Sequence, residues 1–121
     1  MSAPMNQPVN QPPVPEQILQ VITNFWSSRA VYVFTKLGIP DLLKSGPKTV
    51  EELASATKTH APSLYRVLRA LASTGFVSAT ADGRFAQTPV SEILVTDAAG
   101  SLRWFTISEL GQEHYPAWGN L

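Results

Sequence analysis

Residues 64–88 read LYRVLRALASTGFVSATADGRFAQT, and this stretch decides the fold. Its first half repeats apolar side chains at helical spacing as far as Gly75, a residue type that commonly ends helices. Two short runs of β-forming residues then flank Asp82-Gly83, a dipeptide typical of a type I′ hairpin turn. A helix followed by a two-stranded hairpin predicts the recognition helix and wing of a winged helix-turn-helix domain.

The segments before this stretch supply further helices. Residues 49–57 open with a capping box, in which Thr49 and Glu52 satisfy each other's backbone amides. Residues 39–46 predict a short helix that begins with Pro40 and is followed by a glycine. Residues 16–37 contain no Pro or Gly and predict a long helix. The expected fold class is therefore mainly α: a winged helix-turn-helix with a small β-hairpin wing and extra helices, dimerising through the long N-terminal helix.

The predicted long helix is apolar on nearly every side. One broad face carries Ile18, Val21, Ile22, Phe25, Trp26 and Val33. Such a helix must be buried on several sides, and a domain of about 100 residues rarely surrounds one helix completely. We therefore expect a second chain to cover it, the alternative being the central helix of a monomer. The predicted dimer interface consists of Ile18, Val21, Ile22, Phe25, Trp26 and Phe34.

The remainder of the chain is divided as follows. Residues 1–15 hold five of the ten prolines and no charge, which predicts a flexible, Pro-rich arm. Residues 16–111 form the expected winged-helix dimerisation domain, in which a helix over residues 101–110 would turn Leu102 and Phe105 inward, with Trp104 as a further candidate. Residues 112–121 look like the start of a linker helix that is cut off as it begins.

Composition excludes several classes of chemistry. The 121 residues include 9 Lys and Arg against 9 Asp and Glu, so no global field draws the chain to nucleic acid or to a membrane. There is no cysteine, and the two histidines, His60 and His114, have no close acidic array, so we expect no metal site. No apolar run is long enough to span a membrane and no signal peptide is evident, so the expected location is cytoplasmic.

A winged helix can also read DNA, and Arg66, Arg69 and Arg84 are the candidate contacts. Four basic residues against one acidic residue lie between Lys58 and Arg84, whereas specific binders often neutralise about 6 to 10 phosphates. We therefore interpret Arg66 and Arg69 as partners of carboxylates or of the wing. A DNA-binding transcriptional regulator is kept as the alternative function.

Five segments in order carry a family resemblance: LGIPDLL (37–43), GPKTVEELA (46–54), LYRVLRALASTGFV (64–77), GRFAQTPVSEIL (83–94) and GSLRWF (100–105). The chain resembles the N-terminal dimerisation domain of S-adenosylmethionine (SAM)-dependent O-methyltransferases of the plant caffeic-acid and bacterial polyketide-tailoring type. The resemblance implies a homodimer, and a SAM domain that follows the winged helix. It also implies that side chains of this domain help to close a pocket for a small aromatic substrate.

Two expectations follow from the resemblance. The possible pocket wall consists of Trp104, Phe105, His114 and Trp118, although a core plus an interface is the simpler interpretation of these side chains. The sequence contains no Gly-x-Gly, which a methyl-donor site needs after a strand, so the cofactor domain is missing from this chain. We therefore expect no catalytic and no cofactor-binding residue here, SAM in the full-length protein only, and no activity of the chain alone.

Overall fold

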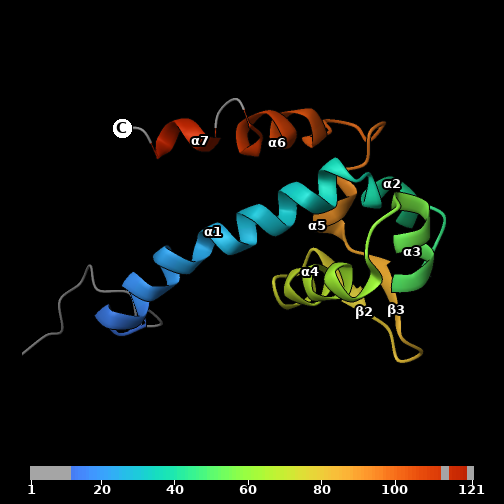
Figure 1. The fold of residues 1–121 in the computed structure, drawn as a ribbon, viewed down its shortest axis with the longest axis horizontal. Coiled ribbons are helices and arrows are strands. Elements are labelled where there is room, and N and C mark those ends of the chain that lie inside the picture. Colours follow the sequence, from blue (N-terminus) through green and yellow to red (C-terminus); the bar gives the residue numbers. More distant parts are fainter. Residues whose placement is uncertain (1–11, 113–114, 120–121) are drawn as a thin grey trace, which may run out of the picture.

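A computed structural model describes residues 12–112 and 115–119 (Figure 1). Its elements are α1 (Val14–Lys36), α2 (Ile39–Leu43), β1 (Lys48–Thr49), α3 (Val50–Thr57), α4 (Ala61–Ser73), β2 (Val77–Ala79), β3 (Arg84–Gln87), α5 (Pro89–Glu92), α6 (Arg103–Leu110) and α7 (Tyr115–Trp118). Figure 1 shows α1 as a long diagonal with most elements gathered around its C-terminal half. The predicted mainly helical, winged-helix fold class is confirmed.

Helix α1 is longer at its start than the sequence predicted. It begins at Val14, so its first two residues fall within the predicted flexible arm of residues 1–15. Pro15 permits this early start because a proline in the first turn lacks only an amide hydrogen that has no partner there. At the other end Gly38 adopts φ 76°, a left-handed conformation that favours glycine and turns the chain into α2.

The wing is a three-stranded antiparallel sheet in the order β1-β3-β2. The pairing of Lys48 with Phe85 adds β1, a strand that the sequence did not predict. The predicted type I′ turn is wrong, since Gly83 has positive φ and Asp82 does not. The Gly83 amide donates to the Thr80 carbonyl (3.2 Å) and the Thr80 amide to the Arg84 carbonyl (2.8 Å). This three-residue loop is a type I turn closed by a glycine bulge.

The core lies where α1, α2, α3, α4 and the wing meet. Leu64, Leu68 and Leu71 follow a 3.6-residue period along α4 and are all buried. Phe34 packs into the same core and is 0% exposed. Its inclusion in the predicted dimer interface is therefore wrong, because its side chain offers no surface to a second chain.

The capping box predicted at the start of α3 is confirmed. The Glu52 amide donates to the Thr49 hydroxyl and the Thr49 amide donates to the Glu52 carboxylate, both at 3.1 Å. A second box pairs Thr88 with Ser91 at the start of α5. These bonds satisfy amides that a helix start leaves without partners.

Helix α6 lies along the opposite side of α1 from α4 (Figure 1). Its partly buried side chains are spaced i, i+3, i+4 and i+7, and they are Arg103, Thr106, Ile107 and Leu110. The predicted inward positions of Leu102, Phe105 and Trp104 are wrong, since all three side chains are exposed. The helical period that faces α1 starts at Arg103, one residue later than the apolar pattern suggested.

Candidate functional site

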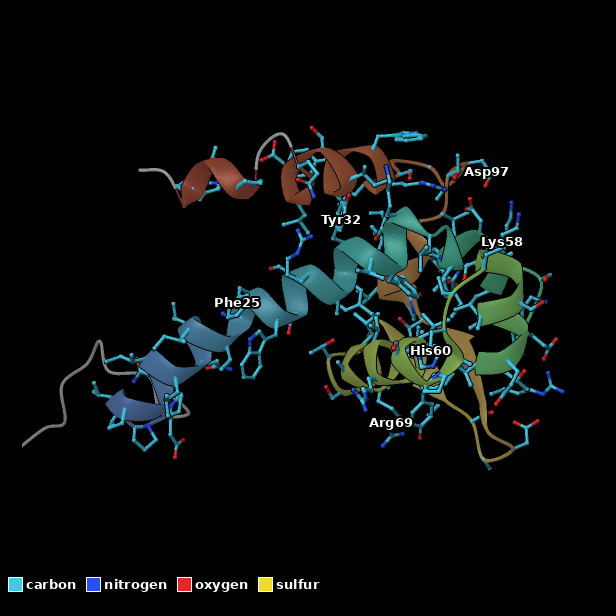
Figure 2. All side chains as sticks on the ribbon, viewed as in Figure 1. Phe25, Tyr32, Lys58, His60, Arg69 and Asp97 are labelled. Carbon is cyan, nitrogen blue, oxygen red and sulfur yellow. The ribbon has the colours of Figure 1, made fainter. Side chains whose placement is uncertain are left out.

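The N-terminal half of α1 carries the principal exposed apolar surface of the described residues. Seven large side chains there are between 47% and 71% exposed: Val14, Ile18, Leu19, Val21, Ile22, Phe25 and Trp26. Figure 2 shows this half of the helix, with Phe25, projecting away from the other elements. Seven further large apolar side chains are exposed elsewhere among the described residues: Tyr65, Val90, Ile93, Leu102, Trp104, Phe105 and Trp118. A contiguous patch of this kind marks an interaction surface rather than ordinary surface variation.

The patch is one broad face of α1, made of two lines of side chains about 100° apart around the helix. Leu19 and Trp26 continue, at helical spacing, the line of Ala30, which faces α4 in the C-terminal half. Ile18 and Phe25 continue the line of Tyr32, which faces α6. In the C-terminal half the chain's own α4 and α6 cover both lines. In the N-terminal half both lines are open, so a partner that buries the patch must cover this broad face.

The predicted interface residues are thus brought together with the one exception already described. Ile18, Val21, Ile22, Phe25 and Trp26 are all exposed on the same half of α1. The rings of Phe25 and Trp26 lie edge to face with centroids 5.8 Å apart. Leu19 belongs to the same patch, and the apolar character of the predicted helix on nearly every side was the signal for it. Val14 also belongs to the patch, although the sequence analysis placed it in the arm of residues 1–15. Whether a second chain contacts these residues stays a prediction.

Helix α6 is fixed to α1 through its C-terminal end. The Arg29 guanidinium donates to the Leu110 carbonyl at 2.5 Å and lies 4.7 Å from the centroid of the Tyr32 ring. A cation at this position complements the negative end of the helix dipole. Gly111 is required here, because a Cβ would come within 2.5 Å of the Ile107 carbonyl oxygen and 3.5 Å of the Tyr32 ring.

A groove of about 300 Å³ runs between α1 and α6. Tyr32 and Trp104 supply its aromatic walls, and Lys36 contributes a cation at its edge. Trp104 is the only one of the four predicted pocket-wall residues that borders this groove among the described residues. Phe105 and Trp118 do not line the groove and are 63% and 73% exposed. His114 lies outside the described residues, and the sequence analysis missed Tyr32.

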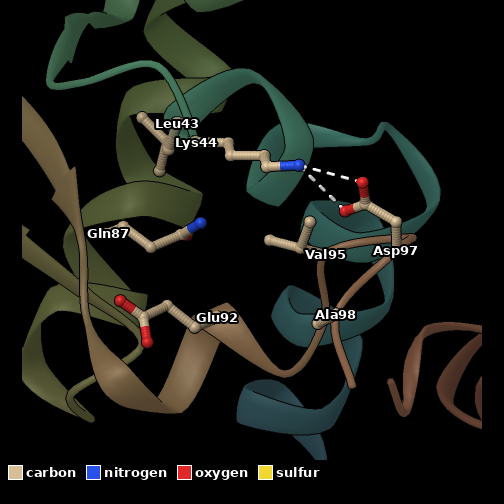
Figure 3. A pocket seen from close by; sticks show the side chains of 7 residues that line it. All are labelled: Leu43, Lys44, Gln87, Glu92, Val95, Asp97 and Ala98. Atoms are coloured by element: carbon tan, nitrogen blue, oxygen red, sulfur yellow. Dashed lines mark hydrogen bonds and ion pairs between the residues drawn. The ribbon is translucent and has the colours of Figure 1, made fainter. Parts of the chain in front are cut away.

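A second hollow of about 390 Å³ lies between α2, β3 and the segment that follows α5 (Figure 3). Across its mouth the Lys44 ammonium pairs with the Asp97 carboxylate at 3.0 Å, and both side chains are largely exposed. The Gln87 side chain is used internally, donating to the Pro40 carbonyl and accepting from the Ser91 hydroxyl. The lining also includes Glu92, whose carboxylate forms no ion pair with another described residue, so one charged group of the hollow is left to orient a ligand.

Of the three candidate DNA contacts, Arg84 is paired with carboxylates of the wing and of α3. The Arg84 guanidinium pairs with the Glu52 carboxylate at 3.0 Å and with the Asp82 carboxylate at 3.2 Å. The hydrogen bonds from Thr49 hold the pKa of Glu52 below its usual value, with Arg84 adding to the effect. The hydrogen bond from Thr80 lowers the pKa of Asp82. Both carboxylates therefore stay charged and hold Arg84.

The interpretation of Arg66 and Arg69 as carboxylate partners is wrong for the part of the chain that the structure describes. Both lie on the exposed face of α4, and no ion pair joins either of them to another described residue. Figure 2 shows Arg69 on the side of α4 away from α1. The spacing of the two arginines placed them on one face, but it could not show that no carboxylate lies opposite.

The described residues meet the requirements of neither a metal site nor a membrane-spanning helix. No three His, Asp or Glu side chains of the described residues come close enough together to hold a metal ion. Among the same residues no helix combines the length and apolar character needed to cross a membrane.

The fold is a winged helix with a projecting apolar helix, and the described residues offer little in the way of a built polar site for a small ligand. These features define the class: a domain whose surface serves protein association. Residues 19–97 match the O-methyltransferase dimerisation domain family, and the chain belongs to this family. The match includes the exposed patch from Leu19 onward, α2 to α5 and the wing.

Individual relatives agree with this assignment. The chain is 41% identical over 109 residues to the phenazine O-methyltransferase PhzM of Lysobacter antibioticus, covering 90% of this chain and 32% of that protein. It is 40% identical over 102 residues to the phenazine-1-carboxylate N-methyltransferase of Pseudomonas aeruginosa, covering 84% of this chain and 30% of that protein. The crystal structure of LaPhzM superposes with a TM-score of 0.85 at 41% identity, over 90% of this chain and 32% of that one. The chain therefore spans about a third of the length of the relatives that it matches.

Proposed function

We propose that this chain is the dimerisation and substrate-lid domain of a SAM-dependent O-methyltransferase. The observation that carries the proposal is the exposed apolar half of α1, whose large apolar side chains form one broad face. Fully burying one such side chain contributes about 1.5–3 kcal/mol, and association costs roughly 4–15 kcal/mol. The seven on each copy are 47–71% exposed, so each contributes less than this, but their combined burial is comparable in size to the cost of association.

The proposed substrate is a small aromatic or polyketide-type molecule with a hydroxyl group. Support comes from the aromatic groove between α1 and α6 and from two relatives whose names refer to phenazines. One of them is named as an N-methyltransferase, so the acceptor oxygen rests on the family rather than on each relative. Trp104, Phe105, His114 and Trp118 remain the proposed contributors to the lid.

The residues of this chain do not fit SAM itself. A methyl-donor site needs a glycine-rich turn directly after a strand, so that backbone amides approach the cofactor. The sequence holds no Gly-x-Gly, and the three described strands all belong to the wing. In the proposal, parts of the full-length protein outside this chain bind SAM, residues 112–121 lead toward them, and the chain alone has no activity.

DNA binding remains the second candidate because Arg66 and Arg69 are exposed without a carboxylate partner among the described residues. Against it stand a net charge of zero and the pairing of Arg84 with Glu52 and Asp82. Two arginines on each copy give a small phosphate footprint even in a dimer. The dimerisation role is therefore the better supported of the two.

Light scattering of the 121-residue chain, combined with fluorescence anisotropy against mixed-sequence duplex DNA at low salt, tests both functions. The proposal predicts a mass of twice 13.2 kDa and no DNA binding. A monomer would contradict the dimerisation role. Salt-sensitive DNA binding that Arg66→Ala with Arg69→Ala abolishes would favour the regulator instead.

A further inference from the structure

The connection between α5 and α6 is held in one conformation by its own hydrogen bonds. The Leu102 amide donates to the Ile93 carbonyl at 2.8 Å, and the Ser101 hydroxyl donates to the Val95 carbonyl at 2.7 Å. The Ser101 hydroxyl also accepts from the Arg103 amide at 3.2 Å, where α6 begins. The loop therefore brings Thr96 and the first residue of α6 to the same place.

The carboxylate of Asp41, in the first turn of α2, accepts hydrogen bonds both from the α5–α6 connection and from the first residue of α6. Thr96 donates to it twice, through its amide (2.8 Å) and its hydroxyl (2.6 Å). The Arg103 guanidinium donates to the same carboxylate at 3.0 Å and to the Thr96 hydroxyl at 2.7 Å. The Thr96 hydroxyl thus donates to Asp41 and accepts from Arg103, which uses both of its hydrogen-bonding functions.

The Arg103 side chain has little freedom to lie anywhere else. It is only 16% exposed, and its Nε is buried without a hydrogen-bond partner among the described residues. Its guanidinium lies 5.1 Å from the centroid of the Trp104 ring, in a cation–π arrangement. It also passes 3.9 Å from the position that a Cβ on Gly38 would occupy. A buried donor without a partner is unfavourable, so the bonds at the other end of the guanidinium must hold it in place.

We infer that Thr96, Asp41 and Arg103 are positioning residues that fix the start of α6 on α2 and thereby set the orientation of Trp104. Trp104 follows Arg103 directly and stacks on its guanidinium, so any shift of Arg103 moves the aromatic wall of the groove. Arg29 holds the other end of α6, which leaves this network to determine the N-terminal end. The value of this orientation for substrate binding rests on the proposed function, whereas the positioning itself does not.

The variant pair Thr96→Val and Thr96→Ser separates the hydroxyl from the size of the side chain. Fluorine NMR of the 5-fluorotryptophan-labelled chain gives one resonance each for Trp26, Trp104 and Trp118, assigned by single Trp→Phe variants. Thr96→Val should shift or broaden the Trp104 resonance and leave that of Trp26 in place. Amides of α6 should exchange with deuterium about tenfold faster, as expected for the loss of hydrogen bonds to charged groups. Thr96→Ser should behave as the unmodified chain.

Two further variants complete the test. Asp41→Asn removes the shared charge and should reproduce the Trp104 shift, so it carries the test if Thr96→Val fails to fold. Asp97→Asn, one residue from Thr96, breaks an exposed ion pair of the same loop and should change neither resonance. An unshifted Trp104 resonance and unchanged α6 exchange in both Thr96→Val and Asp41→Asn would overturn the inference. Failure of dimerisation is distinguishable, because it would alter the Trp26 resonance and not that of Trp104 alone.

Discussion

The two halves of α1 have nearly the same apolar character and opposite surroundings. In the C-terminal half, Ala30 and Phe34 are buried against the core, and Arg29 and Tyr32 lie under α6. In the N-terminal half, the residues that continue the same two lines are exposed. The apolar lines of α1 extend beyond the part of the helix that its own domain buries. The sequence is therefore that of a helix buried along its whole length, but the chain itself buries only the C-terminal half. We propose that a second copy covers the other half.

The largest expected effect comes from breaking the covered half. Phe34→Ala removes a fully buried aromatic side chain and leaves a cavity, which should lower the free energy of unfolding by about 3–5 kcal/mol. Denaturant unfolding of the chain measures this difference. If Phe34 were instead an interface residue, its loss would change the dissociation constant with little change in the unfolding of the monomer.

Breaking the open half should act on association. Phe25→Asp places a charge in the patch and should raise the dissociation constant of the dimer at least about 30-fold, equivalent to about 2 kcal/mol. Sedimentation equilibrium over a concentration series measures it. The matched control is Val90→Asp, since Val90 is exposed to the same 47% as Phe25 but lies outside the patch. Equal weakening by both variants would contradict a localised interface.

A smaller effect should come from α3, which packs on α4 and so supports the cover of the C-terminal half. Thr49→Ala removes the hydroxyl that caps α3 and should cost about 1 kcal/mol in the free energy of unfolding. Thr49→Ser keeps the hydroxyl and is the control. Thermal unfolding distinguishes them, and the dissociation constant should be the same in both variants because the cap lies away from the patch.

The smallest expected effect is on the pH dependence of the free energy of unfolding, through Asp41, which holds the start of α6. Partial burial opposes ionisation of Asp41, but the hydrogen bonds from Thr96, followed by the charges of Arg103 and Lys44, hold its pKa below the ordinary 3.8. A lowered pKa in the folded state contributes stability that is present above the unfolded value and is lost as the pH falls through the folded value. Below about pH 4 the stability of the unmodified chain should therefore fall more steeply than that of Asp41→Asn. Parallel curves in urea unfolding would contradict this role of Asp41.

Local signals predicted much of the fold. The Thr49–Glu52 capping box, the leucine period of α4 and the apolar surface of α1 each follow from neighbouring residues, and each is present. The missed features depend on distant pairings instead. Strand β1 forms because Lys48 pairs with Phe85, which is far away in the sequence. A strand of only two residues is too short to show an alternating apolar pattern. The bulged turn after β2 depends on hydrogen bonds of Thr80 that the Asp-Gly dipeptide does not specify.

The exposed patch on α1 could be predicted because the helical period alone determines which side chains share a face. The orientation of α6 could not, because packing against distant residues determines it. Five of the six predicted interface residues lie in one exposed patch, because spacing alone places them. The register of α6 was not predictable, since it depends on Arg103 reaching Asp41 and on Arg29 reaching Leu110. For the same reason, the sequence could not show that Arg84, rather than Arg66 or Arg69, is the candidate DNA contact that carboxylates hold.

Hydrogen–deuterium exchange along α1 tests the central claim most directly. At concentrations that favour association, residues 14–26 should be protected to nearly the same degree as residues 27–36, because a second copy covers them. Phe25→Asp should remove the protection from residues 14–26 only. Rapid exchange of residues 14–26 in the unmodified chain at every concentration would contradict the account, since the open half of the helix would then have no partner.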